Sequence, residues 1–333
     1  MQIVDRLVDR TVAFVTGIPK MYYEGWGDPD LLESLVEYAR KLGPPADIDV
    51  TWREGKRRWD GTYLFEGWFT SPAKKLPLPP EARTAYFQML LPPKPFGGGA
   101  PSMCIHLAGT GDATYLGRRL LARPLLKERI GAIVLQNPFY GPRRPHWQRG
   151  TRLRRMTDQL MMNLATVEET RALLKWLRDD GYTKLGVTGY SMGGFMAGFA
   201  AQTVPFPIAA IPCAAGDTAV APLIDSPLRN ICDWESLAEE AGSADHAEML
   251  MRQTLSSLAL SEHGTPVAPE AAIIVGARAD EFVPPSEPLE LHRHWSGSEL
   301  RWINGGHTTG WLLNPGPIRQ AIVDAFRRLE EIL

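Results

Sequence analysis

The sequence has few cysteines, no long apolar run and almost no net charge. Its three cysteines, Cys104, Cys213 and Cys232, are an odd number without Cys-x-x-Cys spacing. This argues against a disulfide framework or a thiolate zinc site and favours a reducing compartment such as the cytoplasm. No window approaches the roughly 18 uninterrupted apolar residues that a membrane-spanning helix needs. A formal net charge of −2 gives the whole molecule no electrostatic reason to bind nucleic acid.

Motifs for nucleotides and metals are also missing. Gly109-Thr110-Gly111 lacks the third glycine of a dinucleotide fingerprint, and no Walker pattern is present. His292 and His294 are close in sequence, but alternate residues on a helix point about 200° apart. No cysteine or carboxylate partner is evident for them. The sequence therefore predicts neither a metal nor a cofactor.

The first 45 residues look like an appendage of two helices with a loop at Trp26. The second helix, 30–42, is opened by Asp28-Pro29. Asp5 and Asp9 argue against a secretory signal, because they stand where a positive segment and then an apolar run are needed. We expect the apolar face of the first helix to pack on the protein's own core. A partner or a membrane surface is the alternative, although the mixed charges do not especially favour a membrane. That face consists of Ile3, Val4, Leu7, Val8, Val12 and Val15.

Strand patterns begin near Ile48 and recur at 62–69 and 84–91. They are rich in Tyr, Phe, Trp and Thr with partial alternation, which predicts an antiparallel edge. Pro- and Gly-rich turns at 76–80 and 92–99 follow the second and third of these strands. Six short apolar runs come next, most of them separated by helical stretches, which predicts a mostly parallel sheet covered on both faces. These runs are 103–107, 132–136, 185–188, 208–212, 272–275 and 300–303.

One stretch, 216–267, breaks this alternation, because it is helical or irregular and has no convincing strand. An insertion between two strands of such a sheet lies over their carboxyl ends. We therefore interpret it as a cap or lid on a main domain spanning 46–333, with an ordinary surface excursion as the alternative.

The segment Gly189-Tyr190-Ser191-Met192-Gly193 matches the pattern Gly-x-Ser-x-Gly. An apolar strand precedes it and a helix-forming stretch follows it. In such a nucleophile elbow, a sharp turn lifts the serine hydroxyl clear of the sheet, and the helix N-terminus suits a developing negative charge. We therefore predict Ser191 as a nucleophile.

A serine nucleophile needs a base, and the base needs an orienting acid. In this arrangement the acid and then the histidine follow the serine along the chain. His307 is the predicted base because it lies in a glycine-containing loop after a late strand. Asp280 is the predicted acid because it follows the preceding strand, while Glu281 and Asp217 are rivals.

Acyl chemistry also needs donors for the oxyanion. The Met192 amide opens the helix after the nucleophile and is one candidate. The loop 106–112 should supply the second, for which we favour Thr110, with Gly109 and Ala108 as close rivals.

Arginines cluster after two strands, near the expected edge of the site. They suggest recognition of an anionic phosphate or carboxylate on a substrate, with a solvated charged face as the alternative. The candidates for substrate binding are Arg118, Arg119, Arg143 and Arg144.

Several longer motifs resemble the alpha/beta hydrolase domain-containing protein 18 family. The resemblance covers roughly Pro101 to the C-terminus and is weaker around Tyr22–Gly27. Ala113 stands where relatives usually carry a histidine, and the insertion after Cys213 is short. The matching stretches are His106–Asp112, Asn137–Gly141 with Arg143, Arg144 and Pro145, Ser191–Gly194, Ile211–Cys213, Gly305–His307 and Arg319–Phe326.

The resemblance implies a serine hydrolase fold with a triad of Ser191, Asp280 and His307, and a link to acyl-lipid or phospholipid chemistry. Together with the residue patterns, it predicts a serine esterase that needs no cofactor. The expected substrate is a small-molecule or lipid ester, with possible peripheral membrane contact through the N-terminal helix. The alternatives are a peptidase or acyltransferase on the same triad, or a non-catalytic scaffold that has kept the fold.

Overall fold

A nine-stranded sheet forms the centre of the computed structural model, which describes residues 2–16, 20–93 and 100–333. The strand order is β1-β2-β3-β5-β4-β6-β7-β8-β9. Most of the predicted turn at 92–99 lies outside the described residues. The strands are β1 (Thr51–Arg57), β2 (Tyr63–Thr70), β3 (Thr84–Leu91), β4 (Ser102–Leu107), β5 (Ile130–Leu135), β6 (Leu185–Tyr190), β7 (Ala209–Cys213), β8 (Ile273–Ala277) and β9 (Glu299–Ile303).

The sheet is antiparallel at one edge and parallel elsewhere, as the sequence predicts. β1, β2, β3 and β5 pair antiparallel in that order, and β2 and β3 run in continuous register from Tyr63 opposite Leu91 to Thr70 opposite Thr84. From β5 through β4 to β9 every neighbouring pair is parallel. The carboxyl ends of these six strands therefore meet at one edge of the sheet, where ligands bind in folds of this type.

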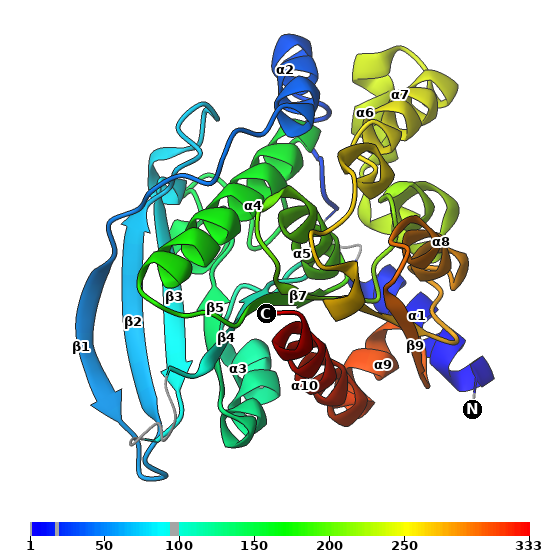
Figure 1. Ribbon diagram of the computed structural model, residues 1–333. Helices are drawn as coiled ribbons and strands as arrows, with labels where there is room; N and C mark the ends of the chain where they lie inside the picture. The colour runs from blue at the N-terminus through cyan, green and yellow to red at the C-terminus, as the bar shows by residue number, and fades with distance from the viewer. Residues whose placement is uncertain (1, 17–19, 94–99) are drawn as a thin grey trace.

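Helices cover both faces of the sheet (Figure 1). Side chains of α2, α4, α5 and α8 pack in one large apolar cluster, and those of α3 and α10 pack in a second. The strands between these layers read as nearly continuous apolar runs because both of their faces are buried. The helices outside the cap are α1 (Gln2–Thr16), α2 (Pro29–Arg40), α3 (Leu116–Ala122), α4 (Met156–Asp179), α5 (Met192–Thr203), α8 (Ser286–His294), α9 (His307–Leu313) and α10 (Pro315–Ile332).

Helix α1 packs the opposite way from our expectation. Its carboxylates Asp5 and Asp9 are buried, whereas Ile3, Val4 and Leu7 are 82%, 61% and 63% exposed. The buried face instead carries these two carboxylates, which accept the amides of His307 and Thr308 and the hydroxyl of Thr309. The described part of this face also has Val8 and Val12 half-buried.

The segment after α1 shares the main core. Tyr22 and Trp26 are buried in the same apolar cluster as α2 and α4. The indole of Trp26 donates to the Leu237 carbonyl in the cap, and the Met21 amide donates to the Ile231 carbonyl. The two N-terminal helices of the predicted appendage are thus joined to both the sheet domain and the cap.

The predicted cap stands between β7 and β8 as a group of short helices, seen above α8 in Figure 1. None of the named strands falls within the described residues 216–267. Its elements are a π-helical turn (Ala221–Asp225), a 3-10 turn (Pro227–Ile231), α6 (Trp234–Ala241), α7 (Ala244–Ser256) and a 3-10 turn (Leu260–His263).

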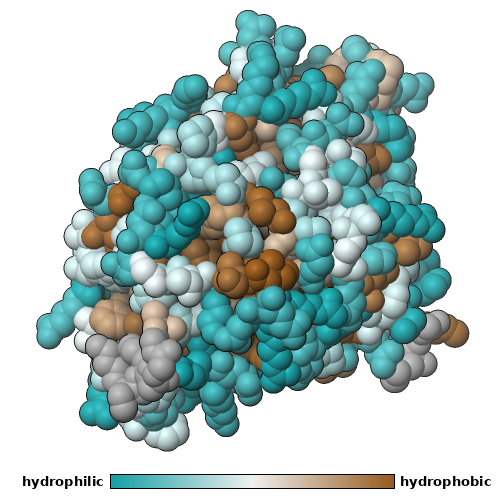
Figure 2. All heavy atoms as spheres, viewed as in Figure 1, coloured by the Kyte–Doolittle hydropathy of each residue, from teal (hydrophilic) through white to brown (hydrophobic). Residues whose placement is uncertain are grey.

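Among the described residues, none of the helices combines the length and the apolar character that crossing a bilayer requires. Figure 2 shows hydrophilic side chains over most of one face, with apolar atoms exposed in small groups between them.

Candidate active site

Ser191 occupies the tight turn between β6 and α5 in a strained backbone conformation. Its φ is 56° and its ψ is −126°, a region that a residue with a Cβ rarely adopts. The turn closes so tightly that a Cβ on Gly189 would lie 2.2 Å from the carbonyl oxygen of Gly193. A Cβ on Gly194 would likewise lie 2.6 Å from the Cys213 carbonyl oxygen. These contacts explain why glycines flank the serine and why its side chain stands at the end of the sheet.

His307 and Asp280 come together from two neighbouring loops. His307 is the first residue of α9, which follows β9 after a short loop, and Asp280 lies in the loop after β8. The Nδ1 atom of His307 lies 2.8 Å from Oδ2 of Asp280. The other carboxylate oxygen of Asp280 accepts the amides of Phe282 and Val283 at 2.9 and 2.8 Å. The carboxylate is therefore fixed by its own loop and presents one oxygen to the imidazole.

The two rival acids lie elsewhere. The Glu281 carboxylate pairs with Arg6 and Arg10 of α1, at 3.4 and 3.1 Å. Asp217 accepts the amide and hydroxyl of Ser261 in the cap, at 2.7 and 2.8 Å. Of the three carboxylates considered from sequence, Asp280 is the one that the structure brings to His307.

Two features that the sequence analysis missed hold His307 in place. The Tyr190 hydroxyl, next to Ser191, donates to the His307 carbonyl at 2.7 Å, and the two rings meet edge to face. The Asp9 carboxylate on α1 accepts the His307 amide at 2.7 Å. The only signal in the sequence was the spacing of Asp5 and Asp9, which puts both carboxylates on one face of a helix.

Burial and the neighbouring charges act on the pKa of His307 in opposite directions. Burial lowers the pKa of the imidazole, but the charge and hydrogen bond of Asp280 and the charge of Asp9 raise it. The net result is a pKa above the usual value of 6.5. A protonated imidazole is thus stabilised beside the elbow, as a base that accepts a proton during a reaction requires.

The candidate oxyanion donors lie beside Ser191. Met192 begins α5, and the first amides of an α-helix have no partner within the helix. Gly109 and Thr110 line a cavity together with Ser191, and a Cβ on Gly109 would come within 4.0 Å of the Ser191 Cβ. The next amide of this loop, that of Gly111, donates to the Tyr140 hydroxyl at 3.0 Å.

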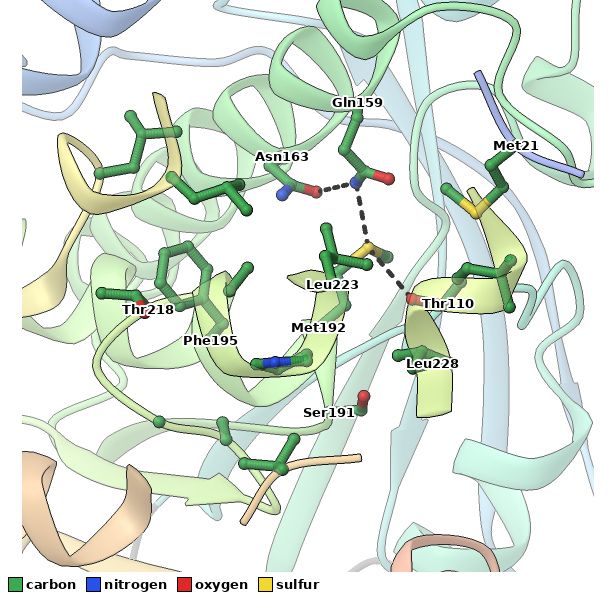
Figure 3. Close-up of a pocket in the computed structure, with 18 of the residues that line it drawn as sticks. Met21, Thr110, Gln159, Asn163, Ser191, Met192, Phe195, Thr218, Leu223 and Leu228 are labelled. Carbon is green, nitrogen blue, oxygen red and sulfur yellow. Dashed lines mark hydrogen bonds between the residues drawn. The ribbon is translucent and has the colours of Figure 1, made fainter. Parts of the chain in front are cut away.

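Ser191 lies at the junction of two cavities. The inner cavity, about 90 Å³, is lined by uncharged residues, most of them apolar. In Figure 3 the Ser191 side chain lies on one side of it, near Met192 and Leu228, while Gln159 and Asn163 of α4 lie toward the other end. The Met192 sulfur contacts the Gln159 amide nitrogen at 3.3 Å and the Thr110 hydroxyl at 3.7 Å.

The outer cavity is larger, about 590 Å³, and more polar. It is lined by both Ser191 and His307, which places the serine and the histidine on one shared space. Thr110, Leu228 and Ile231 line both cavities, so the loop after β4 and the cap form the boundary between them.

The four predicted substrate-binding arginines have different surroundings. Arg118 lines the outer cavity, but its guanidinium bonds to Asp112 and to the carbonyls of His106, Leu135 and Thr114. Arg119 donates to Gln88, and Arg144 is exposed.

Arg143 is fully buried and forms a two-pronged ion pair with Glu169 at 2.8 and 2.6 Å. Of the four predicted arginines, only Arg118 lines either of these two cavities among the described residues. Arg152, which was not among the four, also lines the outer cavity. Nor do the described residues contain a group of three or more His, Cys, Asp or Glu side chains placed to hold a metal ion.

Known proteins with this fold include several esterases. An acetyl xylan esterase from Paenibacillus sp. R4 superposes with a TM-score of 0.57 and 13% identity, over 86% of this chain and 92% of that chain. Acetyl xylan esterase 1 from Thermoanaerobacterium sp. JW/SL YS485 superposes with a TM-score of 0.56 and 12% identity, over 92% of this chain and 96% of that chain. A cold-adapted esterase from an Arctic intertidal metagenomic library superposes with a TM-score of 0.50 and 14% identity, over 84% of this chain and 99% of that chain. At these identities the likeness establishes the fold.

The family described as alpha/beta hydrolase domain containing 18 matches residues 19–251 and 238–328. These matches span most of the chain and include the elbow, both loops beside it and the cap. The chain therefore has the α/β-hydrolase fold and belongs to the alpha/beta hydrolase domain containing 18 family.

Proposed function

We propose that this protein is a serine hydrolase that cleaves carboxylic esters through an acyl-enzyme. One observation carries the proposal: Ser191, in a strained elbow, shares a cavity with His307, whose Nδ1 is hydrogen-bonded to Asp280. A nucleophile, a base and an orienting acid are the groups that acyl transfer needs.

In the first half of the proposed reaction, the Ser191 Oγ attacks the ester carbonyl carbon and its proton passes to Nε2 of His307. Asp280 keeps the imidazole in the tautomer that can accept this proton, and it stabilises the imidazolium. The Met192 amide and an amide of the loop at Gly109 or Thr110 would hold the oxyanion. The imidazolium then protonates the leaving alcohol oxygen as the carbon–oxygen bond breaks.

In the second half, His307 takes a proton from water, and the resulting hydroxide attacks the acyl carbon. The carbon–oxygen bond to Ser191 breaks, and the serine oxygen recovers its proton from the imidazolium. The products are a carboxylic acid and an alcohol, with no cofactor consumed.

The two cavities suggest which part of the ester goes where. The inner cavity is uncharged and is bounded by the cap side chains Leu223, Leu228 and Ile231, which suits an acyl chain. The outer cavity is lined by the charged residues Asp112, Arg118 and Arg152, which suits a polar alcohol portion. An acyl-lipid ester, including a phospholipid-like one, combines these two properties.

Helix α1 supports contact with a lipid surface. Its acidic residues Asp5 and Asp9 point inward, so its outer face combines exposed apolar side chains with Arg6 and Arg10, which are 55% and 64% exposed. Burial of Asp5 and Asp9 takes two acidic charges away from the outer face, although Glu281 still pairs with both arginines. Val12 of the same helix lines the outer cavity, so a lipid bound there would lie beside the site.

A fluorophosphonate probe and a graded ester panel test the enzymatic proposal. We expect labelling at Ser191 in the wild type, none in Ser191→Ala and strongly reduced labelling in His307→Ala. Esters graded by acyl length and head-group charge should be hydrolysed, and release of alcohol rather than amine separates an esterase from a peptidase. A folded wild-type protein that neither reacts with the probe nor hydrolyses any ester would favour a non-catalytic scaffold.

Co-sedimentation with anionic vesicles tests the surface proposal separately. Replacing Leu7 and Phe14 by serine removes two exposed apolar side chains and leaves the buried carboxylates unchanged. We expect reduced vesicle binding with retained hydrolysis of a soluble short-chain ester. Equal vesicle binding by the wild type and this double variant would contradict the role of α1.

A further inference from the structure

At the start of α9 the Thr309 hydroxyl accepts the Gly306 amide at 2.8 Å, but the amides of His307 and Thr308 are bound from outside the helix. Its N-cap residue is Gly306, which carries no side chain to accept the amides that a helix leaves without partners at its start. Asp9 supplies the missing acceptor from a different helix. Its Oδ2 accepts the His307 amide at 2.7 Å and its Oδ1 accepts the Thr308 amide at 2.9 Å.

The same carboxylate also reaches the loop of the acid. Oδ2 of Asp9 accepts the Glu281 amide, the residue next to Asp280, at 3.3 Å. One buried side chain thus binds the backbone of both loops that meet in the His307–Asp280 hydrogen bond.

The fit around this carboxylate is tight. A Cβ added to Gly306 would lie 2.5 Å from Oδ2 of Asp9. The loop can therefore come this close to the Asp9 carboxylate only with glycine at position 306. Asp5, one turn earlier on α1, accepts the Thr309 hydroxyl at 2.8 Å and completes the contact between the two helices. Figure 1 shows α1 lying beside α9.

We propose that Asp9 is a positioning residue for the catalytic histidine: its carboxylate, delivered by α1, fixes the backbone of His307 relative to Asp280 and Ser191. The inference rests on the proposed esterase function. Asp9 acts through the loop amides and does not enter the proton transfer itself. Displacement of a catalytic group by about 1 Å can cost on the order of 100-fold in rate, so holding this backbone in place has kinetic value.

The negative charge of Asp9 adds an electrostatic signature. The polar groups that contact His307 are the carboxylates of Asp280 and Asp9 and the hydroxyl of Tyr190. Glu281, the residue after Asp280, is paired with Arg6 and Arg10 of α1. Burial lowers the pKa of His307, and the two aspartates raise it. Removing the charge of Asp9 while keeping its shape should therefore lower the pKa of His307, which a purely mechanical cap would not do.

The test compares Asp9→Asn with Asp5→Asn, a matched change on the same buried helix face that touches neither His307 nor the acid loop. For Asp9→Asn we expect kcat on a soluble ester to fall at least about tenfold with little change in KM. The acidic limb of its kcat/KM profile should move to lower pH. Nuclear magnetic resonance titration of the His307 ring, assigned with His307→Ala, should show the same direction. Asp5→Asn should keep the wild-type profile.

A second variant, Gly306→Ala, adds a methyl group against the Asp9 carboxylate and leaves Asp9 itself unchanged. Gly306→Ala should displace Asp9 and reproduce the loss of kcat, so the inference remains testable if Asp9→Asn folds poorly. Folded variants of both residues with wild-type kcat and an unshifted profile would overturn the inference while leaving the esterase intact. A wild-type protein that is unreactive toward fluorophosphonate would instead overturn the proposed function, and the ring titration would still report on Asp9.

Discussion

Asp280→Asn is the sharpest test of the proposed chemistry, because the structure dictates how the asparagine must sit. Oδ1 of Asp280 accepts two backbone amides, those of Phe282 and Val283. An asparagine has to keep its carbonyl oxygen in that position, since an NH₂ group there would oppose two donors. Its NH₂ group then takes the place of Oδ2, 2.8 Å from Nδ1 of His307.

This forced orientation selects the wrong imidazole tautomer. Nδ1 must accept a hydrogen bond from the asparagine, so the ring proton moves to Nε2, which can no longer accept the serine proton. In serine proteases the corresponding change lowers kcat by about ten-thousandfold, or about 5.5 kcal/mol of transition-state stabilisation. We expect a loss of that order here, together with a lower pKa of His307.

The assay is steady-state hydrolysis of a soluble ester across pH, with thermal unfolding as the check on folding. Asp217→Asn is the matched control, because Asp217 was a rival acid by sequence and bonds to Ser261 instead. Wild-type activity is expected for the control. A folded Asp280→Asn variant that keeps more than about a tenth of wild-type kcat/KM would refute the assigned role of Asp280.

Three further predictions concern stability and the elbow. Burial, and then the charge of Glu290, raise the pKa of Glu287 from 4.5 to about 7. The folded protein therefore holds an extra proton between these values, and its stability should fall as pH rises from about 4.5 to 7. Glu287→Gln should flatten that part of a denaturation profile, and an unchanged slope would contradict the assignment. Arg143→Met leaves Glu169 buried without its partner and should lower the free energy of unfolding by about 3–5 kcal/mol in a denaturant titration. Gly193→Ala places a Cβ 2.7 Å from the Leu107 carbonyl oxygen, so it should disturb the loop at Gly109 and reduce kcat; undisturbed fluorophosphonate labelling would argue against this.

The sheet and its helices were largely predictable because local patterns agree with the tertiary environment. The six parallel strands read as short apolar runs because helices bury both of their faces. The elbow was predictable because a serine between glycines, after a strand and before a helix, has few other structural solutions.

Long-range polar contacts were not predictable in the same way. The apolar spacing of α1 suggested burial of Ile3, Val4 and Leu7, yet the helix buries its carboxylates against the loop at His307. A hydrophobic pattern indicates which residues share a face of a helix. It does not indicate which face lies against backbone amides that need an acceptor. Similarly, the cluster of arginines in the sequence did not reveal that Arg143 is fully buried against Glu169.

The bond between Asp9 and His307 joins positions 298 residues apart. During synthesis, helix α1 leaves the ribosome long before α9 exists, and its two carboxylates have no amides to bind until the downstream loop arrives. Nascent chains that already contain the serine elbow would consequently lack an organised base. Under the proposed chemistry, a chain that ends before residue 307 would have no base to activate Ser191.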